Sequence, residues 1–429
     1  MLLNFFFILL TRNLISIYLF SSMKAKKYSV RIREISVFIL AVSLCFAAAS
    51  FNNAQRGIPV VDLDNPRGSV NLKLSDLLDD ITIVPLETRN DLLLSVDRSD
   101  FTITENYILV STRDKLLQFD RQGNYLKTLA ISGRGPNEFI SNIPLQIVID
   151  YKREIAHYTD YKDRESIFRI DLKTGNFLEP LRPGLSLFSI KSIDSEGNIY
   201  GYPSYMDVSD LHLLAYRYDP IDKSLTTYKG YRDFVNLLYG DIMFRQGDEI
   251  FFIRSAHSDT LFKISGERML PHSVIKLKNQ RKSNVPSKYA TFSFPVYGSW
   301  GFVIHKMDNN FSDQGGWFVS ITELPTSYLL LNNRGELQSV RSVTIDPFAL
   351  TIDIDSHIKL RLSERKIEPT PSISGQWAYY AVEAYNMMEL IEDALGGNQL
   401  TASQRRTLES VAAKIDDDGN PVLIIGKIK

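Results

Sequence analysis

Short apolar segments that end in a polar residue recur along the chain, and a turn follows each one. The five clearest segments are residues 116–120, 167–171, 215–219, 261–265 and 328–332. A glycine or proline stands just behind each segment, namely Gly123, Gly175, Pro220, Gly266 and Gly335. An Asp or Asn that opens a turn caps its own backbone, and glycine adopts the positive φ that such turns require. The pattern predicts five strand–turn units of the same kind.

The spacing of these units indicates the architecture. Their closing residues lie 51, 48, 46 and 67 positions apart, and a period near 48 is typical of the four-stranded blade of a β-propeller. We interpret residues 296–318, within the longest step, as an insertion. Segments upstream of several units, such as 107–110, 197–200 and 249–252, are expected to be inner strands of the same blades.

Strand-like segments also flank the five units on both sides. Residues 81–86 precede them, and residues 351–354, 377–382 and 421–425 follow them. A sixth blade completed by strands from both ends would close the ring and remove exposed sheet edges. We therefore predict an all-β, six-bladed β-propeller over residues 65–429, with a closing strand at about 421–427.

The segment before that closing strand has the period of a helix instead of a strand. Apolar residues recur at helical spacing over 384–394 and 403–415, within a helical insertion at about 384–416. Gly396 and Gly397 stop the first helix, and Thr401 or Ser403 can cap the second. We expect a small C-terminal helical hairpin that packs against the last blade and has a structural role.

The N-terminal region is typical of an export signal. Residues 23–54 begin at Met23, continue with a basic stretch, and contain an apolar run over 37–49 that ends in small residues. That run is short of the roughly 20 residues of a membrane helix, so a signal peptide is favoured over a retained anchor. Cleavage is expected after Ala49 or Ala54. Residues 1–22 are interpreted as an extra segment that arises from a start placed too early, since polar residues interrupt their apolar pattern.

The cysteine content and the charge balance exclude several kinds of site and partner. The one cysteine, Cys45, lies inside the apolar run, so the mature chain would hold no disulfide, catalytic thiol or cysteine–zinc site. A lipid anchor at Cys45 is the less favoured alternative, because Leu44 before it is larger than lipoprotein signals accept. Residues 1–54 hold six bases and one acid, which leaves 43 bases and 49 acids in the remainder. This mildly acidic balance excludes a nucleic-acid footprint, and no membrane span is expected in the mature chain.

Four phrases carry a resemblance to a known family. They are residues 83–88 (IVPLET), 119–124 (FDRQGN), 133–139 (GRGPNEF) and 416–424 (DDDGNPVLI). The chain resembles the six-bladed β-propeller proteins exported by Bacteroidetes, over about residues 65–429. The resemblance implies an NHL-like propeller in the periplasm or cell envelope. Lipoproteins are predicted among these relatives, and the residue before Cys45 departs from that pattern. No reaction is implied, so no catalytic residue follows from it.

Two places offer candidate binding residues. In the loop 133–139, Arg134 could present a bidentate fork to a carboxylate or sugar acid, and Glu138 could accept from a hydroxyl. The plainer interpretation, which we favour, is a connection between blades in which Arg134 pairs with Glu138 or a backbone carbonyl. In the Gly-rich segment near 296–318, Trp300 and Trp317 could form a stacking platform for a sugar or peptide. Equally, they could be core residues of the fifth blade.

Signals for metal or covalent chemistry are weak. The histidines show no i, i+4 pairing, and neither a Gly-x-Ser-x-Gly elbow nor a phosphate loop is present. Blade ends could still bring together acids for calcium, with candidates at Asp160, Asp194, Asp259 and Asp308, although each is more readily explained as a turn acid.

Two functions therefore stay open, and the first is favoured. It is a non-catalytic binding or scaffold protein of the bacterial cell envelope, expected to be a monomer without a cofactor. Its partner would be an unknown small molecule, a glycan or an envelope protein. The alternative is a calcium-dependent hydrolase or lyase that acts at the mouth of the propeller channel.

Overall fold

The computed structural model describes most of the chain beyond residue 57. The described residues are 58, 60–62, 65, 67–135, 137–140, 145–203, 213–229, 242–246, 249–253, 260–276, 292–293, 300–307, 325–332, 337–353, 372–397 and 400–429. Residues 59–429 form a compact unit of their own.

Within these residues the strands form six sheets, and five of them are blades of four consecutive antiparallel strands. The first blade contains β4 (Asp100–Ile103), β5 (Tyr107–Ser111), β6 (Lys115–Asp120) and β7 (Tyr125–Ser132). The second contains β9 (Ile147–Asp150), β10 (Ile155–Asp160), β11 (Asp163–Asp171) and β12 (Phe177–Leu181). The third contains β13 (Leu187–Ile193), β14 (Ile199–Pro203), β15 (Leu213–Asp219) and β16 (Ser224–Lys229). The chain therefore folds as a mostly β, propeller-like arrangement.

The fourth and fifth blades receive extra strands from elsewhere in the chain. The fourth contains β17 (Ile242–Gln246), β18 (Glu249–Ile253), β19 (Thr260–Ser265) and β20 (Arg268–Lys276). The fifth contains β21 (Phe292–Ser293), β22 (Trp300–Met307), β23 (Pro325–Asn332) and β24 (Leu337–Ile345). The strands β1 (Val60–Asp62) and β2 (Ser69–Lys73) add in parallel to β20 and β24, and β25 (Leu350–Asp353) adds to β24 antiparallel. In the first blade, β8 (Glu138–Phe139) adds in parallel to β7.

The sixth sheet combines both ends of the described chain. Its order is β26 (Ser372–Ser374), β27 (Trp377–Val382), β28 (Val422–Ile428) and β3 (Leu78–Pro85). The register of β28 against β3 runs from Val422 opposite Pro85 to Ile428 opposite Leu78. Three of the four flanking segments predicted to complete a sixth blade lie in this sheet, whereas the prediction is wrong for residues 351–354, because β25 pairs with β24 of the fifth blade. Two short 3₁₀ helices, η1 (Leu74–Asp76) and η2 (Val96–Arg98), lead into β3 and β4.

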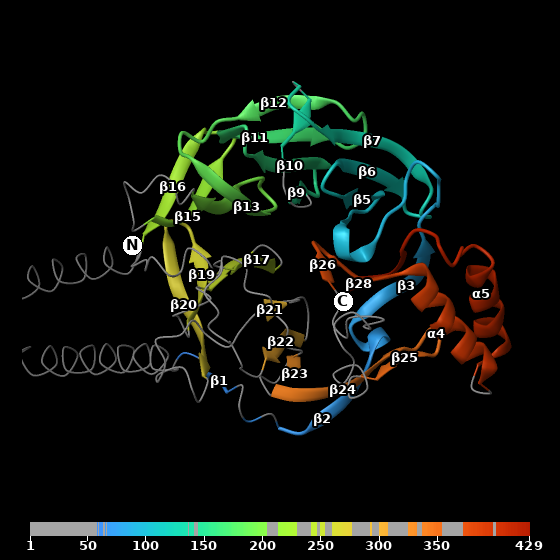
Figure 1. The fold of residues 1–429 in the computed structure, drawn as a ribbon. Coiled ribbons are helices and arrows are strands. Elements are labelled where there is room, and N and C mark those ends of the chain that lie inside the picture. Colours follow the sequence, from blue (N-terminus) through green and yellow to red (C-terminus); the bar gives the residue numbers. More distant parts are fainter. Residues whose placement is uncertain are drawn as a thin grey trace, which may run out of the picture. The chain divides into compact units, whose positions relative to one another are not determined.

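The recurring apolar segments are the third strands of their blades, β6, β11, β15, β19 and β23. The prediction of the inner strands is wrong by one strand. Residues 107–110, 197–200 and 249–252 belong to the second strands of their blades, not to the first. The first strands, such as β9, β13 and β17, lie toward the centre in Figure 1, and β12 and β16 lie at the periphery. The expected insertion at 296–318 is partly wrong as well: residues 300–307 form the regular strand β22, and much of the rest lies outside the described residues.

The predicted turn chemistry is confirmed. Asp120 Oδ1 accepts hydrogen bonds from the N–H groups of Gln122 and Asn124, both at 2.9 Å, and Gly123 has a φ of 89°. In the second blade, Asp171 Oδ1 accepts from the N–H of Thr174 at 2.8 Å, and Gly175 has a φ of 80°. The repeated phrase in the sequence is therefore a repeated local requirement of the backbone.

Continuous apolar strands arise where a sheet is buried against a neighbour on both faces. In β5, Ile108 and Val110 join a cluster shared with the sixth sheet, whereas Leu109 between them joins a cluster shared with the second blade. Further clusters join the second blade to the third, the third to the fourth, and the fifth to the sixth sheet. Successive side chains of a strand point to opposite faces, so a sheet between two neighbours needs apolar residues at nearly every position.

The helical hairpin forms close to its predicted place. The helix α4 spans Ala384–Gly396, and α5 spans Ala402–Ala412, which ends three residues before the predicted Ile415. Thr401 caps α5 in a capping box with Gln404. Met387, Ile391 and Leu408 are fully buried, in a cluster shared with the fifth and sixth sheets. The hairpin therefore packs where it was expected.

We expect Gly123→Ala to destabilise the fold much more than the matched change Gly266→Ala. Both glycines have positive φ, and each stands in the turn between the third and fourth strands of its blade. A Cβ at Gly266 would meet nothing within 4 Å, whereas a Cβ at Gly123 would overlap the carbonyl oxygen of Pro85 in β3. The left-handed backbone alone costs about 1 kcal/mol, and the clash should bring the loss at Gly123 to about 3 kcal/mol. Equal losses in chemical denaturation of the two variants would contradict this packing of the first blade against β3.

Candidate functional site: a hollow at the inner strands

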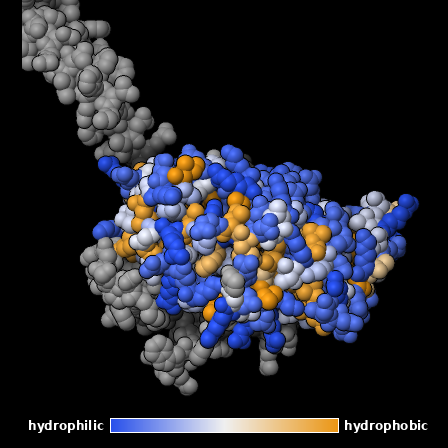
Figure 2. All heavy atoms as spheres, turned by 90° about the horizontal axis from the view of Figure 1, so that it is seen from above, coloured by the Kyte–Doolittle hydropathy of each residue, from blue (hydrophilic) through white to orange (hydrophobic). Residues whose placement is uncertain are grey.

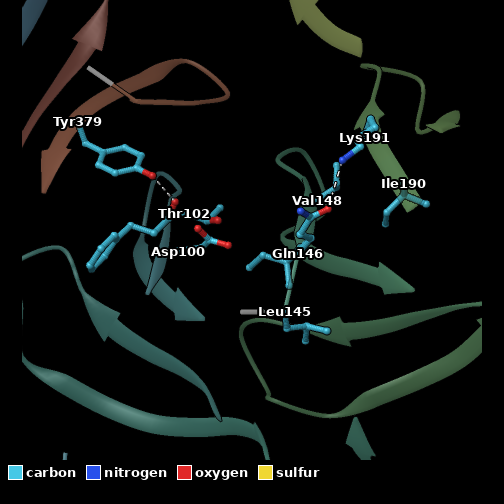
Figure 3. Close-up of a pocket in the computed structure, with 10 residues that line it drawn as sticks. Asp100, Thr102, Leu145, Gln146, Val148, Ile190, Lys191 and Tyr379 are labelled. Carbon is cyan, nitrogen blue, oxygen red and sulfur yellow. Dashed lines mark hydrogen bonds between the residues drawn. The ribbon is translucent and has the colours of Figure 1, made fainter. Parts of the chain in front are cut away.

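A hollow of about 250 Å³ opens where the inner strands of three blades meet β27. Its walls come from residues 100–102 of β4, residues 145–148 at the start of β9, residues 190–191 of β13, and Tyr379 of β27. Figure 3 shows Asp100 and Thr102 on one side and Gln146 and Lys191 on the other. The volume is slightly below the roughly 300–1,000 Å³ of typical ligand pockets, so the hollow suits a small molecule.

Asp100 is the one carboxylate in the wall of this hollow. It is the first residue of β4, and its side chain is accessible to solvent. No hydrogen bond or ion pair joins its carboxylate to another of the described residues. The surrounding protein nevertheless removes part of its hydration, and this desolvation raises the pKa of Asp100 above its ordinary value. The carboxylate is therefore an acceptor that the described part of the fold leaves unused.

Lys191 provides the opposite charge from the third blade. Its ammonium donates to Gln146 Oε1 at 3.2 Å and lies 5.9 Å from the centre of the Tyr202 ring. It is half-buried, and desolvation lowers the pKa of Lys191. Within the described chain no carboxylate pairs with it, so a neutral amide is the main partner of a partly desolvated cation.

Contacts between blades fix the strands that carry these groups. The hydroxyl of Tyr379 in β27 donates to the carbonyl oxygen of Phe101 at 2.8 Å, directly beside Asp100. The buried Phe101 ring packs against the Tyr379 ring, with a centroid distance of 6.2 Å. The site is therefore positioned by the sixth sheet as well as by its own strands.

The far ends of the inner strands are joined by their hairpins. Gln376 Nε2 donates to Glu105 Oε2 at 3.0 Å, which links the sixth sheet to the first blade. Asn106 Nδ2 donates to Glu154 Oε1 at 2.5 Å, which links the first blade to the second. Arg153 donates to the carbonyl oxygen of Glu196 at 3.2 Å, which links the second to the third. Polar groups at this end of the strands thus satisfy one another.

The loop with Arg134 and Glu138 lies away from the hollow. Glu138 Oε2 accepts the N–H of Gly135 at 2.6 Å, and the Lys162 ammonium donates to the carbonyl oxygens of Gly135 and Glu138. Arg134 is exposed, and in the described chain it forms no ion pair with Glu138. The loop therefore uses Glu138 for its own shape. The binding role of both residues stays a prediction.

The other sequence candidates are dispersed. Trp300 begins β22, but its side chain lies outside the described residues, as do the whole of Trp317, Asp259 and Asp308. Asp194 accepts the N–H groups of Glu196, Gly197 and Asn198 in a turn of the third blade.

Asp160 does not fit the expectation of a solvated turn acid. It is buried, and it accepts from the N–H groups of Ile140 and Lys162. Among the described residues no group of three His, Cys, Asp or Glu side chains could hold a metal ion.

Sequence reasoning missed Asp100, Gln146 and Lys191. Each stands in or next to the first strand of a blade, whereas the recurring segments in the sequence mark the third strands. A usable signal is a charged or amide residue within an otherwise apolar inner strand, since such a strand faces the centre of the ring. Asp100 can accept a hydrogen bond from a cation, and Lys191, held by Gln146, can donate one to an anion.

On the face that Figure 2 shows, the hydrophobic residues of the described chain do not gather into one large patch. Hydrophobic residues of the described chain occur there in several separate places among hydrophilic ones. Large exposed apolar side chains such as Leu93, Tyr161 and Ile221 come from different blades and loops. None of the helices in the described residues is both long and apolar enough to cross a membrane.

Comparisons with known proteins give the relationships of the chain. Among solved structures it is similar to a "Putative exported protein" from Bacteroides fragilis, with a TM-score of 0.56 and 13% identity, over 86% of this chain and 99% of that chain. It is also similar to a member of the DUF4221 family from Bacteroides vulgatus, with a TM-score of 0.44 and 9% identity, over 82% of this chain and 97% of that chain. At such identities, likeness to a solved structure concerns the fold alone. None of the curated proteins matches the chain.

One family model matches nearly all of the chain beyond the segment interpreted as an export signal. The match covers residues 58–427, and the family is described as a domain of unknown function, DUF4934. The matched range contains both helices of the C-terminal hairpin and all described sheets apart from the last residue of β28. The chain therefore belongs to the DUF4934 family.

Proposed function

We propose that this protein is an exported, non-catalytic binding protein that holds a small polar molecule in the hollow between its inner strands. The observation that carries the proposal is the pair Asp100 and Lys191, two opposite charges that different blades direct to one hollow. Charged groups that lose hydration are costly unless a partner compensates them. A bound polar molecule would supply the partners that the described residues do not.

The proposal includes a six-bladed, NHL-like ring in the cell envelope. The sixth sheet supports it, because β3 and β28 pair across the two ends of the unit and share one apolar cluster with the first blade and another with the fifth. Pairing of strands from both ends closes such a ring between its first and last blades. The centre of the ring is the usual place for a ligand site.

Binding is favoured over the hydrolase alternative because the hollow offers few oxygen ligands. A calcium ion requires six to eight of them. Asp100 is the one carboxylate in the wall, and Gln146 Oε1 already accepts from the Lys191 ammonium.

Export is tested by blocking the cleavage that the signal segment implies. In the native host we expect a mature chain that begins at Ser50 or Gln55, because small residues precede both positions. Replacing both Ala49 and Ala54 by leucine should leave the precursor uncleaved, whereas Ala41→Leu, inside the apolar run, should be processed normally. N-terminal peptides from fractionated cells, identified by mass spectrometry, give the answer. A lipid-modified Cys45 at the mature N-terminus would overturn soluble export in favour of an anchor.

Ligand binding in the hollow is tested with a library of small sugars, sugar acids, amino acids and polyols, by ligand-observed NMR on the mature chain. We expect hits that bind the Asp100→Asn/Lys191→Met double variant at least roughly tenfold more weakly. Each charged hydrogen bond that the variant loses is worth about 1.5–3 kcal/mol. The matched control Asp417→Asn/Lys414→Met removes an exposed acid and base of the C-terminal segment and should bind normally. A library without hits, or hits that bind both double variants equally, would contradict the proposal.

Asp100→Asn should also stabilise the ligand-free protein slightly at neutral pH. Since the pKa of Asp100 is raised on folding, the folded state holds the proton more tightly than the unfolded state does. The ionised carboxylate therefore reduces stability above the folded pKa, and this penalty disappears as the pH falls through the folded pKa toward the ordinary value near 3.8. The gain should be below about 1 kcal/mol, because the group is accessible to solvent.

Thermal unfolding at pH 7 and pH 3 measures this gain, which we expect at pH 7 and not at pH 3. Asp417→Asn serves as the control. Destabilisation of Asp100→Asn at pH 7 would mean that the carboxylate has a structural partner.

A further inference from the structure

The two charges of the hollow are separated by a whole blade. Asp100 lies on β4 of the first blade and Lys191 on β13 of the third, with the inner strand β9 of the second blade between them. Figure 3 shows them on opposite sides of the hollow. No ion pair joins them within the described chain, so neither group neutralises the other.

The lining between the charges mixes polar and apolar groups. Val148 and Leu145 contribute apolar surface to it. These side chains favour hydrocarbon, and no third charged group lines the hollow. Additional hydrogen-bonding groups stand close to the two charges, with Thr102 next to Asp100 and Gln146 next to Lys191.

This arrangement distinguishes between classes of small polar molecule. A neutral sugar would offer both groups hydrogen bonds but no opposite charge, and a simple amine or carboxylate would neutralise one group and leave the other without an opposite charge. A molecule with an ammonium at one end and a carboxylate at the other would compensate both. Its short aliphatic linker would lie beside the apolar side chains of Val148 and Leu145.

We propose that the hollow binds a small zwitterion, with its ammonium at Asp100, its carboxylate at Lys191, and methylene groups between them. This inference rests on the proposed function, since it names the ligand class of the same site. Thr102 and Gln146 assist as hydrogen-bonding neighbours of the two charged groups.

The test compares zwitterions with probes that carry one charged end or none. Titration calorimetry of the mature chain with 4-aminobutanoate and 6-aminohexanoate should show binding at least tenfold tighter than with butylamine, with butanoate or with glucose. Two linker lengths are used so that the separation of the charges does not decide the result alone. Equal affinity for a zwitterion and for one of its singly charged analogues would overturn the inference.

Single variants identify which end of the probe each residue holds. Asp100→Asn should weaken the zwitterions and butylamine by roughly 10- to 100-fold while leaving butanoate unchanged. Lys191→Met should weaken the zwitterions and butanoate and leave butylamine unchanged. Asp417→Asn and Lys414→Met are the controls, and thermal unfolding confirms that each variant is folded. Zwitterion binding that survives both Asp100→Asn and Lys191→Met would also overturn the inference.

The failure of this inference can be told apart from failure of the proposed function. If glucose or another neutral molecule binds best and the hollow variants abolish that binding, the hollow is a ligand site and the zwitterion class is wrong. If substitutions in the hollow change the affinity of no probe and no library member, the proposed function and the zwitterion inference are both wrong.

Discussion

The antiparallel pairing of β28 with β3 is the interaction on which the rest of the structure depends. It places the last strand of the chain in the middle of the sixth sheet, between β27 and a strand from the start of the unit. Through β27 the same sheet holds Tyr379, whose hydroxyl fixes the carbonyl of Phe101 beside Asp100. Loss of the terminal pairing would thus release one wall of the hollow as well as the ends of the chain.

The terminal pairing is further secured by Asn420 at the entrance to β28. This buried amide donates to the carbonyl oxygens of Glu87 and Leu92 and accepts the N–H of Leu94, with distances from 2.7 to 2.9 Å. A single side chain thereby satisfies three backbone groups of the segment that links β3 to β4. Because buried backbone groups need such partners, this contact couples the closing strand to the first blade.

The architecture was readable from the sequence where local chemistry repeats. Asp120 with Gly123, and Asp171 with Gly175, make the same turn for the same backbone reason, and each closes the third strand of a blade. The turn alone does not distinguish third strands from inner ones, because Asp194 with Gly197 makes it after the inner strand β13. The strand β22 was hidden because its Gly-rich surroundings suggested an insertion.

The hollow could not be predicted, because its residues are ordinary by themselves and the ring brings them together. Asp100, Gln146 and Lys191 are each about 45 residues apart in sequence, a consequence of the blade period. The phrase 133–139 attracts more attention, yet its glycines and Glu138 are explained by hydrogen bonds within the loop and to Lys162. Conspicuous motifs in a repeat fold therefore report first on backbone geometry, and candidate sites are better sought among unpaired charges.

The two ends of the inner strands differ in how their polar groups are used. At the hairpin end, Gln376 bonds Glu105 and Asn106 bonds Glu154, so these groups connect neighbouring blades. At the start of β4, Asp100 has no such partner among the described residues, although an amide or apolar residue there would avoid the desolvation that raises its pKa. The polar groups at the hairpin end bond one another, so the unpaired charge of Asp100 adds no stability to the fold. The asymmetry is the kind that functional sites impose on otherwise consistent folds, and it supports the proposed binding site beside Asp100.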